Sequence, residues 1–187
     1  IERLARAGFK EVVINHAYLG SQIEEALGDG SKWGINIQYS PEKEALETAG
    51  GIANALPLLG DSPFLVVNGD VYTAIDFSLE LESPYLAHLV MVDNPPQHPQ
   101  GDFVLDSGVL KPDGLAKLTY SGVGVYSPQL FKDIVKGDSA KLAPLLLSAM
   151  ASNLISGEYY HGIWHDIGTP DRLKLLDASL SKRDVHS

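Results

Sequence analysis

The sequence contains no cysteine, which excludes disulfide bonds and thiolate metal sites and is compatible with a reducing cytoplasm. It also lacks an apolar run long enough to span a membrane. Lys and Arg number 14 against 24 Asp and Glu and form no dense cluster, so we expect neither nucleic acid nor a membrane as a partner. A phosphorylated small molecule stays open, because a divalent cation held by aspartates can neutralise phosphate.

The first residues have the pattern of a helix already under way. Ile1, Leu4 and Ala5 fall on one helical face, and Gly8 is a stop signal. No initiator methionine, N-cap or strand comes before them, and natural domains rarely begin within a helix. We therefore expect the chain to lack its true N-terminus.

Strand and helix patterns alternate along the first half of the chain. Apolar and β-branched runs predict strands at 11–15, 35–40, 64–67 and 87–93. The segments between them predict helices over 21–27, with a capping box from Ser21 to Glu24, and over roughly 49–59, the latter interrupted near Pro57. This alternation favours a doubly wound, mostly parallel, Rossmann-like α/β sheet. The second half predicts a small hairpin, a longer strand ending near Tyr126, and helices beginning near 128, 141 and 170, all within one domain over 1–187.

The stretch FLVVNGDVYT, residues 64–73, places Asp70 directly after an apolar strand. Asn68-Gly69 between apolar runs is the usual signal of a two-residue β-hairpin. The residues after Asp70, however, do not alternate as a returning strand would. In a parallel sheet the apolar run would end at the carboxyl edge, where open α/β sheets bind their ligands. We therefore predict a bend that brings the Asp70 carboxylate into a crevice.

A second group of polar residues lies in HGIWHDIGTP, residues 161–170. His161 and His165 are four apart, which on a helix would place two imidazoles on one face for zinc. The residues around them suit a strand instead, and the Glu of a metalloprotease motif is missing, so surface or hydrogen-bonded histidines are the preferred interpretation. Asp166, just before Gly-Thr-Pro, is either a structural turn residue or a second functional carboxylate.

Two glycine-containing segments carry weaker signals. EALETAGGIANAL, residues 44–56, opens a helix whose backbone N–H groups could face an anion or the edge of a base. It matches neither the dinucleotide-binding nor the P-loop pattern. In TYSGVGVYS, residues 119–127, glycines within a strand indicate either a bulge or the close approach of a ligand or another backbone.

Taken together, these motifs resemble those of sugar-1-phosphate nucleotidylyltransferases. An apolar strand into Asn68-Gly69-Asp70 is preceded by LETAGGI and followed by YSGVGVY and then WHDIGTP, in the order found in that family. The segments VVINHAYLGSQIEEALGDGS, GDFVL and KLAPLLLSAM resemble its branch of bacterial N-acetylmuramate α-1-phosphate uridylyltransferases of cell-wall recycling. The resemblance covers nearly the whole chain.

The resemblance implies a cytoplasmic enzyme that binds two small molecules, a nucleoside triphosphate and a sugar 1-phosphate. An oxygen of the sugar phosphate would attack the α-phosphorus in line, giving an NDP-sugar and pyrophosphate. Asp70 and Asp166 would be the catalytic carboxylates, and together they would hold Mg²⁺. The base and the sugar, uracil and N-acetylmuramate, are implied by the branch alone.

The resemblance also assigns binding residues on each side of the metal. Asn68 would contact the nucleoside near its ribose, and the backbone of Ala49, Gly50 and Gly51 would face the base. The sugar would bind within a small β-hairpin region over approximately 94–160. The residues implied there are Asp102, Ser121, Gly122, Glu158 and Lys141.

The chain departs from the family at its N-terminus. The Gly-rich phosphate loop, a Pro-Lys-Pro segment and the first strand of the sheet are not in residues 1–187. We therefore expect this chain to be inactive alone, and its unpaired strand edges to favour self-association. The alternatives are a non-catalytic nucleotide-sugar-binding or regulatory module, a mannose-1-phosphate guanylyltransferase, an enzyme for glucose 1-phosphate and UTP, and a flavodoxin-like domain that would keep Asp70 and Asp166 apart.

Overall fold

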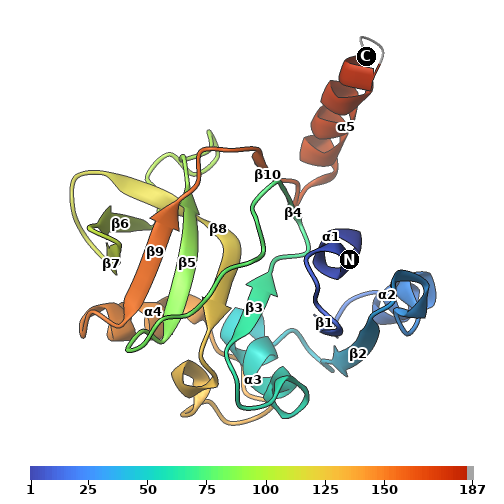
Figure 1. Ribbon diagram of the computed structural model, residues 1–187, viewed down its shortest axis with the longest axis horizontal. Coiled ribbons are helices and arrows are strands. Elements are labelled where there is room, and N and C mark those ends of the chain that lie inside the picture. The colour runs from blue at the N-terminus through green and yellow to red at the C-terminus, as the bar shows by residue number, and fades with distance from the viewer. Residues whose placement is uncertain (185–187) are drawn as a thin grey trace.

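The computed structural model describes residues 1–184 as an α/β fold (Figure 1). The strands are β1 (Glu11–His16), β2 (Asn36–Pro41), β3 (Phe64–Val67), β4 (Val71–Thr73), β5 (Ala87–Val92), β6 (Phe103–Asp106), β7 (Val109–Lys111), β8 (Lys117–Tyr126), β9 (Ile155–Tyr159) and β10 (Trp164–Asp166). The helices are α1 (Glu2–Arg6), α2 (Gly20–Leu27), α3 (Glu47–Leu59), α4 (Leu142–Met150) and α5 (Pro170–Asp184), with short 3₁₀ turns η1 (Ser31–Trp33) and η2 (Pro128–Phe131). The α/β class expected from the sequence is confirmed.

The main sheet has the order β3-β8-β5-β9-β7-β6. Strands β5 and β9 pair in parallel, and β3 runs in the same direction as both of them. β8 lies between β3 and β5 and runs opposite to each, because the chain reaches it through the β6–β7 hairpin rather than through a helical crossover. The expectation of mostly parallel neighbours is therefore corrected: β3, β5 and β9 share one direction, but an inserted strand separates β3 from β5.

Two strand pairs lie outside the main sheet. β1 and β2 pair in parallel, whereas β4 and β10 pair antiparallel. A cavity of about 1090 Å³ is lined by residues of both β1 and β3, including Val13 and Leu65. In the described part of the chain, β1 has a partner strand only on the side of β2, and β3 only on the side of β8. Each of these two strands thus has one open edge.

Apolar side chains on the two faces of the main sheet form two cores. On one face, Leu89 and Met91 of β5 pack against Leu146 of α4 and other buried side chains of α3, η2 and α4. On the other face, Val90 of the same strand packs with Ile75 and with the partly buried aromatic rings near β10. β5 is therefore covered on both faces, which explains why its sequence is a continuous apolar run rather than an alternating one.

Helices differ from the sequence predictions at three places, the first being the helix predicted from near 128, which is only the 3₁₀ turn η2. α2 begins at Gly20 after Leu19 and has no side-chain cap, so the predicted capping box is wrong. The Glu24 carboxylate instead lies within hydrogen-bonding distance of the His16 ring, with 2.8 Å between Oε1 and Nε2. α3 continues through Pro57 to Leu59, because a missing N–H in the last turn removes little of the helix.

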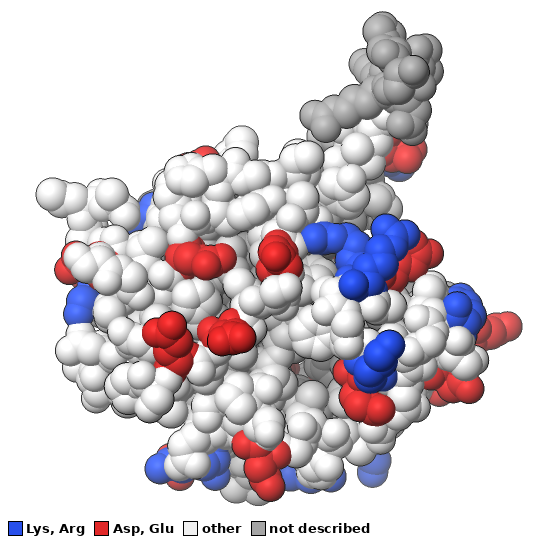
Figure 2. Space-filling view, viewed as in Figure 1, with Lys and Arg blue, Asp and Glu red and all other residues white. Residues whose placement is uncertain are grey.

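The surface carries its charge in scattered groups. Figure 2 shows separate acidic and basic groups on the face in view, with wide uncharged areas between them. This distribution agrees with the formal net charge of −10. Among the described helices, none is both long and apolar enough to cross a membrane.

Candidate active site

Asp70 lies in a bend that follows β3. The chain leaves β3 at Val67, turns at residues 68–70 and enters β4, which pairs with β10 rather than with β3. The Asp70 carbonyl oxygen accepts a hydrogen bond from the Ile167 N–H at 2.8 Å. The predicted bend is confirmed and the hairpin interpretation of Asn68-Gly69 is excluded, but Asp70 is exposed and lines neither the cavity beside β1 and β3 nor the one beside Asp166, so its placement in a crevice stays a prediction.

Asp166 ends β10 directly opposite Val71, the residue that follows Asp70. Gly168 lies between the two carboxylates. A β-carbon placed on Gly168 would lie 2.6 Å from Asp70 Oδ2 and 3.2 Å from Asp166 Oδ1. The two oxygens are therefore no farther apart than the sum of these distances, so the two aspartates expected to share one ion do lie at one place.

The Asp166 carboxylate has a partner at each oxygen. Oδ1 accepts a hydrogen bond from the Gly168 N–H at 2.9 Å, and Oδ2 pairs with Arg172 Nη1 at 2.9 Å. The Asp166 side chain is 28% exposed and that of Arg172 is 31% exposed. Thr169 accepts a hydrogen bond from the Arg172 N–H through its hydroxyl, so this side chain helps to start α5 beside the site.

The turn at Ser121-Gly122 meets Asn68. β8 bulges here, since three of its residues lie opposite a single residue of β5. Gly122 has a φ of +79° and receives a hydrogen bond from the Asn68 N–H at 2.9 Å. A β-carbon on Gly122 would lie 2.8 Å from Nδ2 of the Asn68 side chain, so only glycine fits this contact. Of the two interpretations the bulge is confirmed, and the group that approaches Gly122 is the Asn68 side chain.

The glycine turn before α3 is largely occupied by other parts of the chain. The N–H groups of Ala49 and Gly50 both donate to the Ala140 carbonyl at 3.0 Å, and the Ala49 side chain is fully buried. Gly51 faces the side chains of Asn15 and Glu42, which hydrogen-bond to each other at 2.9 Å. Of the three residues, Gly51 is the one whose backbone faces polar side chains rather than the loop at 138–140.

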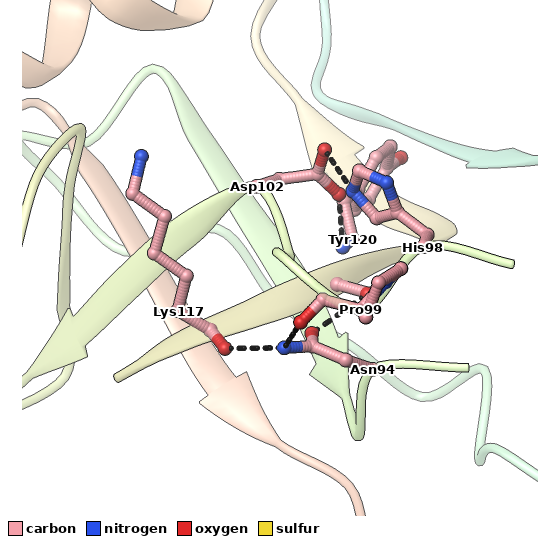
Figure 3. A network of polar contacts seen from close by, with 7 residues as sticks. Asn94, His98, Pro99, Asp102, Lys117 and Tyr120 are labelled. Carbon is pink, nitrogen blue, oxygen red and sulfur yellow. Dashed lines mark hydrogen bonds and ion pairs between the residues drawn. The ribbon is translucent and has the colours of Figure 1, made fainter. Parts of the chain in front are cut away.

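Asp102 belongs to a polar network beneath the proline-rich loop at 94–99 (Figure 3). One carboxylate oxygen lies 3.0 Å from His98 Nε2, and the other accepts the Tyr120 N–H at 2.8 Å. Asn94 donates to the Lys117 carbonyl at 2.9 Å and to the Pro99 carbonyl at 3.3 Å. These contacts fasten the loop to β8.

The other sugar-side candidates are spread over the fold. Ser121 is 1% exposed, and its hydroxyl accepts the Val123 N–H while its carbonyl accepts Trp164 Nε1–H. Glu158 on β9 lies 3.7 Å from the His88 ring. Lys141 precedes α4 at the surface. The structure thus places Ser121 near Trp164 but does not bring Glu158 or Lys141 into contact with the aspartates.

A cavity of about 490 Å³ opens beside Asp166. Its walls come from the loop after β5, from β10 and from the first turns of α5. Trp164 and Leu175 supply apolar surface, whereas Asp93, Asn94 and Gln97 supply polar groups. A concave cavity with largely apolar walls and a few polar groups is the usual form of a small-molecule binding site.

The donor set of the site fits a divalent cation. Mg²⁺ is usually bound by one or two carboxylates, with substrate phosphates and water completing its shell. Asp70 and Asp166 provide two carboxylates that converge from different strands. No cluster of three or more His, Cys, Asp or Glu side chains occurs in the described residues, so the two carboxylates would need a substrate to complete the coordination.

The histidines of the zinc hypothesis lie on and next to a strand, not on a helix. His165 is in β10, where its ring is 6.2 Å from that of Tyr72, and the His161 ring is 3.8 Å from that of Tyr159. The helical spacing on which the zinc interpretation depended is therefore absent at these residues.

The fold and the site define the class. Residues 1–183 match the family model described as nucleotidyl transferase, and the chain belongs to that family as a sugar-1-phosphate nucleotidylyltransferase. It is 56% identical, over 94% of its length and 80% of the relative's, to the N-acetylmuramate alpha-1-phosphate uridylyltransferase of Neisseria meningitidis serogroup B. It is 30% identical, over 91% of its length, to a mannose-1-phosphate guanyltransferase of Hypocrea jecorina, of which it spans about half (51%). A crystal structure of a protein assigned as a glucose-1-phosphate thymidylyltransferase from Bacillus anthracis superposes with a TM-score of 0.78 at 15% identity, covering 95% of this chain and 78% of that one, which shows the shared fold.

The sequence did not indicate the part played by Arg172 or by the loop at 94–97. Arg172 follows Asp166 by six residues and has no motif of its own. One available signal was its position in the first turn of a helix opened by Pro170, close after a candidate carboxylate. The proline-rich loop was recognised only as a loop, because nothing in its composition shows which cavity it borders.

Proposed function

We propose that this protein transfers a uridylyl group from UTP to N-acetylmuramate 1-phosphate and releases pyrophosphate. The uridylyltransferase relative supports this choice of base and sugar over the guanylyltransferase alternative. This chain is 56% identical to the uridylyltransferase, over four-fifths of that relative's length, and only 30% identical to the guanyltransferase. The convergence of Asp70 and Asp166 on Gly168 carries the catalytic part of the proposal. We further propose that the reaction takes place in the cytoplasm and serves the recycling of peptidoglycan.

Asp70 and Asp166 are the residues we assign to a bound Mg²⁺. When bound, the ion would polarise the α-phosphate and offset charge as two anions approach each other. The chain's own contribution is to fix the two carboxylates. Main-chain pairing between β4 and β10 holds their backbones in register, and the Gly168 N–H orients one Asp166 oxygen. This arrangement reduces the reorganisation needed when the substrates arrive.

We assign the nucleotide to the side of Asn68 and α3. Asn68 lies at the end of β3 and borders the same cavity as Asn15 of β1. Ala49 and Gly50 would act there mainly by shaping the turn, since their N–H groups are already bonded, and Gly51 would lie nearest the ligand. The base would then be recognised by the backbone next to Gly51.

We assign the sugar 1-phosphate to the 490 Å³ cavity beside Asp166 and to the region 94–160 around it. Within the proposed sugar site, Asp102 and Ser121 support the walls through internal hydrogen bonds. Gly122 positions Asn68 between the two substrates. Glu158 and Lys141 stay predictions for the outer part of the sugar site.

A pyrophosphate-release panel on the full-length gene product, which is also the protein for the kinetic tests below, tests the reaction. UTP, GTP, dTTP and ATP would each be combined with the 1-phosphates of N-acetylmuramate, mannose and glucose. We expect UTP with N-acetylmuramate 1-phosphate to give the highest kcat/KM. A preference for GTP with mannose 1-phosphate would favour the guanylyltransferase alternative instead.

Two substitutions distinguish an enzyme from a non-catalytic binding module. Asp70→Asn and Asp166→Asn should each lower kcat by about 100-fold or more, because each removes a charge worth several kcal/mol to the transition state. Circular dichroism should be unchanged. Asp61→Asn, at an exposed turn, is the matched control and should keep full activity. A binding module would show no turnover to lose, while its nucleotide-sugar affinity would change little.

We also propose self-association through the open edges of β1 and β3. Each carries unpaired main-chain groups beside the 1090 Å³ cavity, and such edges pair readily with a second copy of the same chain. Light scattering across a concentration series should show a rising mean mass. A constant monomer mass would contradict this proposal without bearing on the catalytic one.

A further inference from the structure

Arg172 is held against the two candidate metal ligands. Its Nη1 pairs with Asp166 Oδ2 at 2.9 Å. Its Nη2 would lie 3.2 Å from a β-carbon on Gly168, the same point that Asp70 Oδ2 approaches within 2.6 Å. The Arg172 guanidinium therefore lies against Asp166 and near Asp70. Its positive charge offsets part of the combined negative charge of the two carboxylates.

The guanidinium also has unused hydrogen-bonding capacity. Its Nε is buried and, among the described residues, has no hydrogen-bond partner. The side chain lines the 490 Å³ cavity, and of the residues lining that cavity in the described part of the chain it is the one arginine or lysine. An arginine with free donors at a cavity wall has the planar fork that matches two oxygens of a phosphate.

The Arg172–Asp166 pair is incompatible with full use of Asp166 as a metal ligand. Oδ1 is bonded to the Gly168 N–H, and Oδ2 is covered by the guanidinium. A cation at the two carboxylates would repel the guanidinium and compete with it for Oδ2. Arg172 would then be released next to the cavity, where an anion is its most favourable new partner.

We propose that Arg172 exchanges partners during the reaction: it neutralises Asp166 in the free protein and binds the phosphate of the sugar 1-phosphate once the carboxylates hold a divalent cation. This inference rests on the proposed function for the identity of the anion. It makes metal binding and phosphate binding cooperative, because the metal displaces Arg172 from Asp166 and thereby frees it for the substrate. A purely structural ion pair at the base of α5 would not have this property.

Binding measurements on the full chain test the exchange without requiring turnover. Mn²⁺ affinity would be measured by electron paramagnetic resonance with no substrate present, and methyl phosphate affinity by calorimetry at saturating Mg²⁺. Arg172→Gln should bind Mn²⁺ about 3- to 10-fold more tightly, because a competing cation has been removed. The same variant should bind methyl phosphate about 10-fold more weakly, because the bidentate donor is lost. Lys174→Gln, exposed two residues later on α5, is the control and should change neither affinity.

The two opposite shifts separate the exchange from a structural role. Weaker Mn²⁺ binding by Arg172→Gln would show that Arg172 only positions Asp166, and unchanged methyl phosphate affinity would show that it does not bind the anion. Either result overturns the proposal.

If Arg172→Gln does not fold, Arg172→Lys serves instead. Its Mn²⁺ affinity should stay within about 2-fold of the parent value, and its methyl phosphate affinity should be about 3- to 10-fold lower, since lysine keeps the charge without the planar fork. Unchanged methyl phosphate affinity in that variant would overturn the proposal too. A substrate panel without turnover would leave these binding results standing, so the two failures are distinguishable.

Discussion

Asp70 and Asp166 are joined through the main chain, because the N–H of Ile167, the residue after Asp166, donates to the Asp70 carbonyl oxygen at 2.8 Å. The separation of the two backbones is thus set by this bond and by the adjoining strand pairing between β4 and β10. Side chains that extend from a paired ribbon can be positioned more precisely than those on a free loop. Substitutions that disturb the space between the carboxylates should therefore affect catalysis more than folding.

Gly168→Ala tests this spacing. The new β-carbon would lie 2.6 Å from Asp70 Oδ2, closer than any real contact, so the carboxylate must move. A displacement of this kind should lower kcat by about 10- to 100-fold. Gly168 is exposed and does not have the positive φ that would favour glycine over alanine. The thermal midpoint should therefore change by only a few degrees. Steady-state kinetics beside thermal denaturation would check this, and unimpaired kcat would show that the two carboxylates need not be this close.

Gly122→Ala should destabilise the fold at the junction of β3 and β8. The residue has a φ of +79°, and an added β-carbon would lie 2.8 Å from the Asn68 amide nitrogen. Strain and overlap together should lower the free energy of unfolding by about 2–4 kcal/mol. Gly137→Ala is the matched control, since Gly137 has a φ of +92° but nothing within 4 Å of the added carbon. Urea unfolding should show the smaller loss for Gly137→Ala, and equal losses would mean that the contact with Asn68 is not important.

Asp102→Ala should loosen the loop that borders the sugar cavity. It removes the contact with His98 and leaves the Tyr120 N–H without its acceptor, which should cost about 1–3 kcal/mol. The KM for the sugar 1-phosphate should rise, because the loop at 94–97 forms one wall of the cavity. Asp106→Ala, whose carboxylate bonds only the neighbouring Ser107 hydroxyl among the described residues, is the control. A raised KM with unchanged stability would instead indicate direct contact between Asp102 and the sugar.

Two buried tyrosines should make stability fall in alkaline solution. Burial raises the pKa of both Tyr120 and Tyr126 above the ordinary value of 10.0, and their hydroxyls share a hydrogen bond of 2.8 Å. Because the folded-state pKa values are raised, the associated stability is fully present below about pH 10 and is lost as the pH rises further, by up to about 1.4 kcal/mol per pH unit for each tyrosine.

The alkaline effect can be measured by urea unfolding between pH 8 and 11. The double variant Tyr120→Phe, Tyr126→Phe should lose less stability over pH 10–11 than the parent chain. Tyr18→Phe serves as the control, since Tyr18 is 82% exposed and its removal should leave the pH dependence as it was. Identical slopes for all three proteins would refute a contribution from the buried pair.

The sequence predicted the bend at Asp70 and the strand around Asp166 because both depend on local pattern: an apolar run, a turn signal and a stop at Gly-Thr-Pro. It could not predict the reversed direction of β8, which depends on how the β6–β7 hairpin returns to the sheet. Nor could it predict how Asp102 is used. A loop aspartate near a sugar motif is typical of ligand contact, but the fold supplies His98 and a backbone N–H that occupy both oxygens.

Some side-chain partners likewise depend on tertiary contact alone. Glu24 has the spacing of a capping box, yet its carboxylate lies against His16, because β1 places that imidazole nearer than the helix N-terminus. Arg172 belongs to the same category: its value to the site comes from the β4–β10 pairing, which carries no signature within α5 itself. Motif spacing therefore located the carboxylates, while the guanidinium of Arg172 beside Asp166 was visible only in three dimensions.

The β4–β10 ribbon also determines when the site can exist. One arm, β4, precedes β5–β9 in the chain and the other, β10, follows them, so Asp70 cannot meet Asp166 and Arg172 until β10 and the start of α5 have been synthesised. A nascent chain that has already folded its main sheet through β9 still has an isolated carboxylate at the bend. Substrate binding thus depends on both arms of the ribbon, and a chain interrupted before β10 would keep one carboxylate of the site and lack the other.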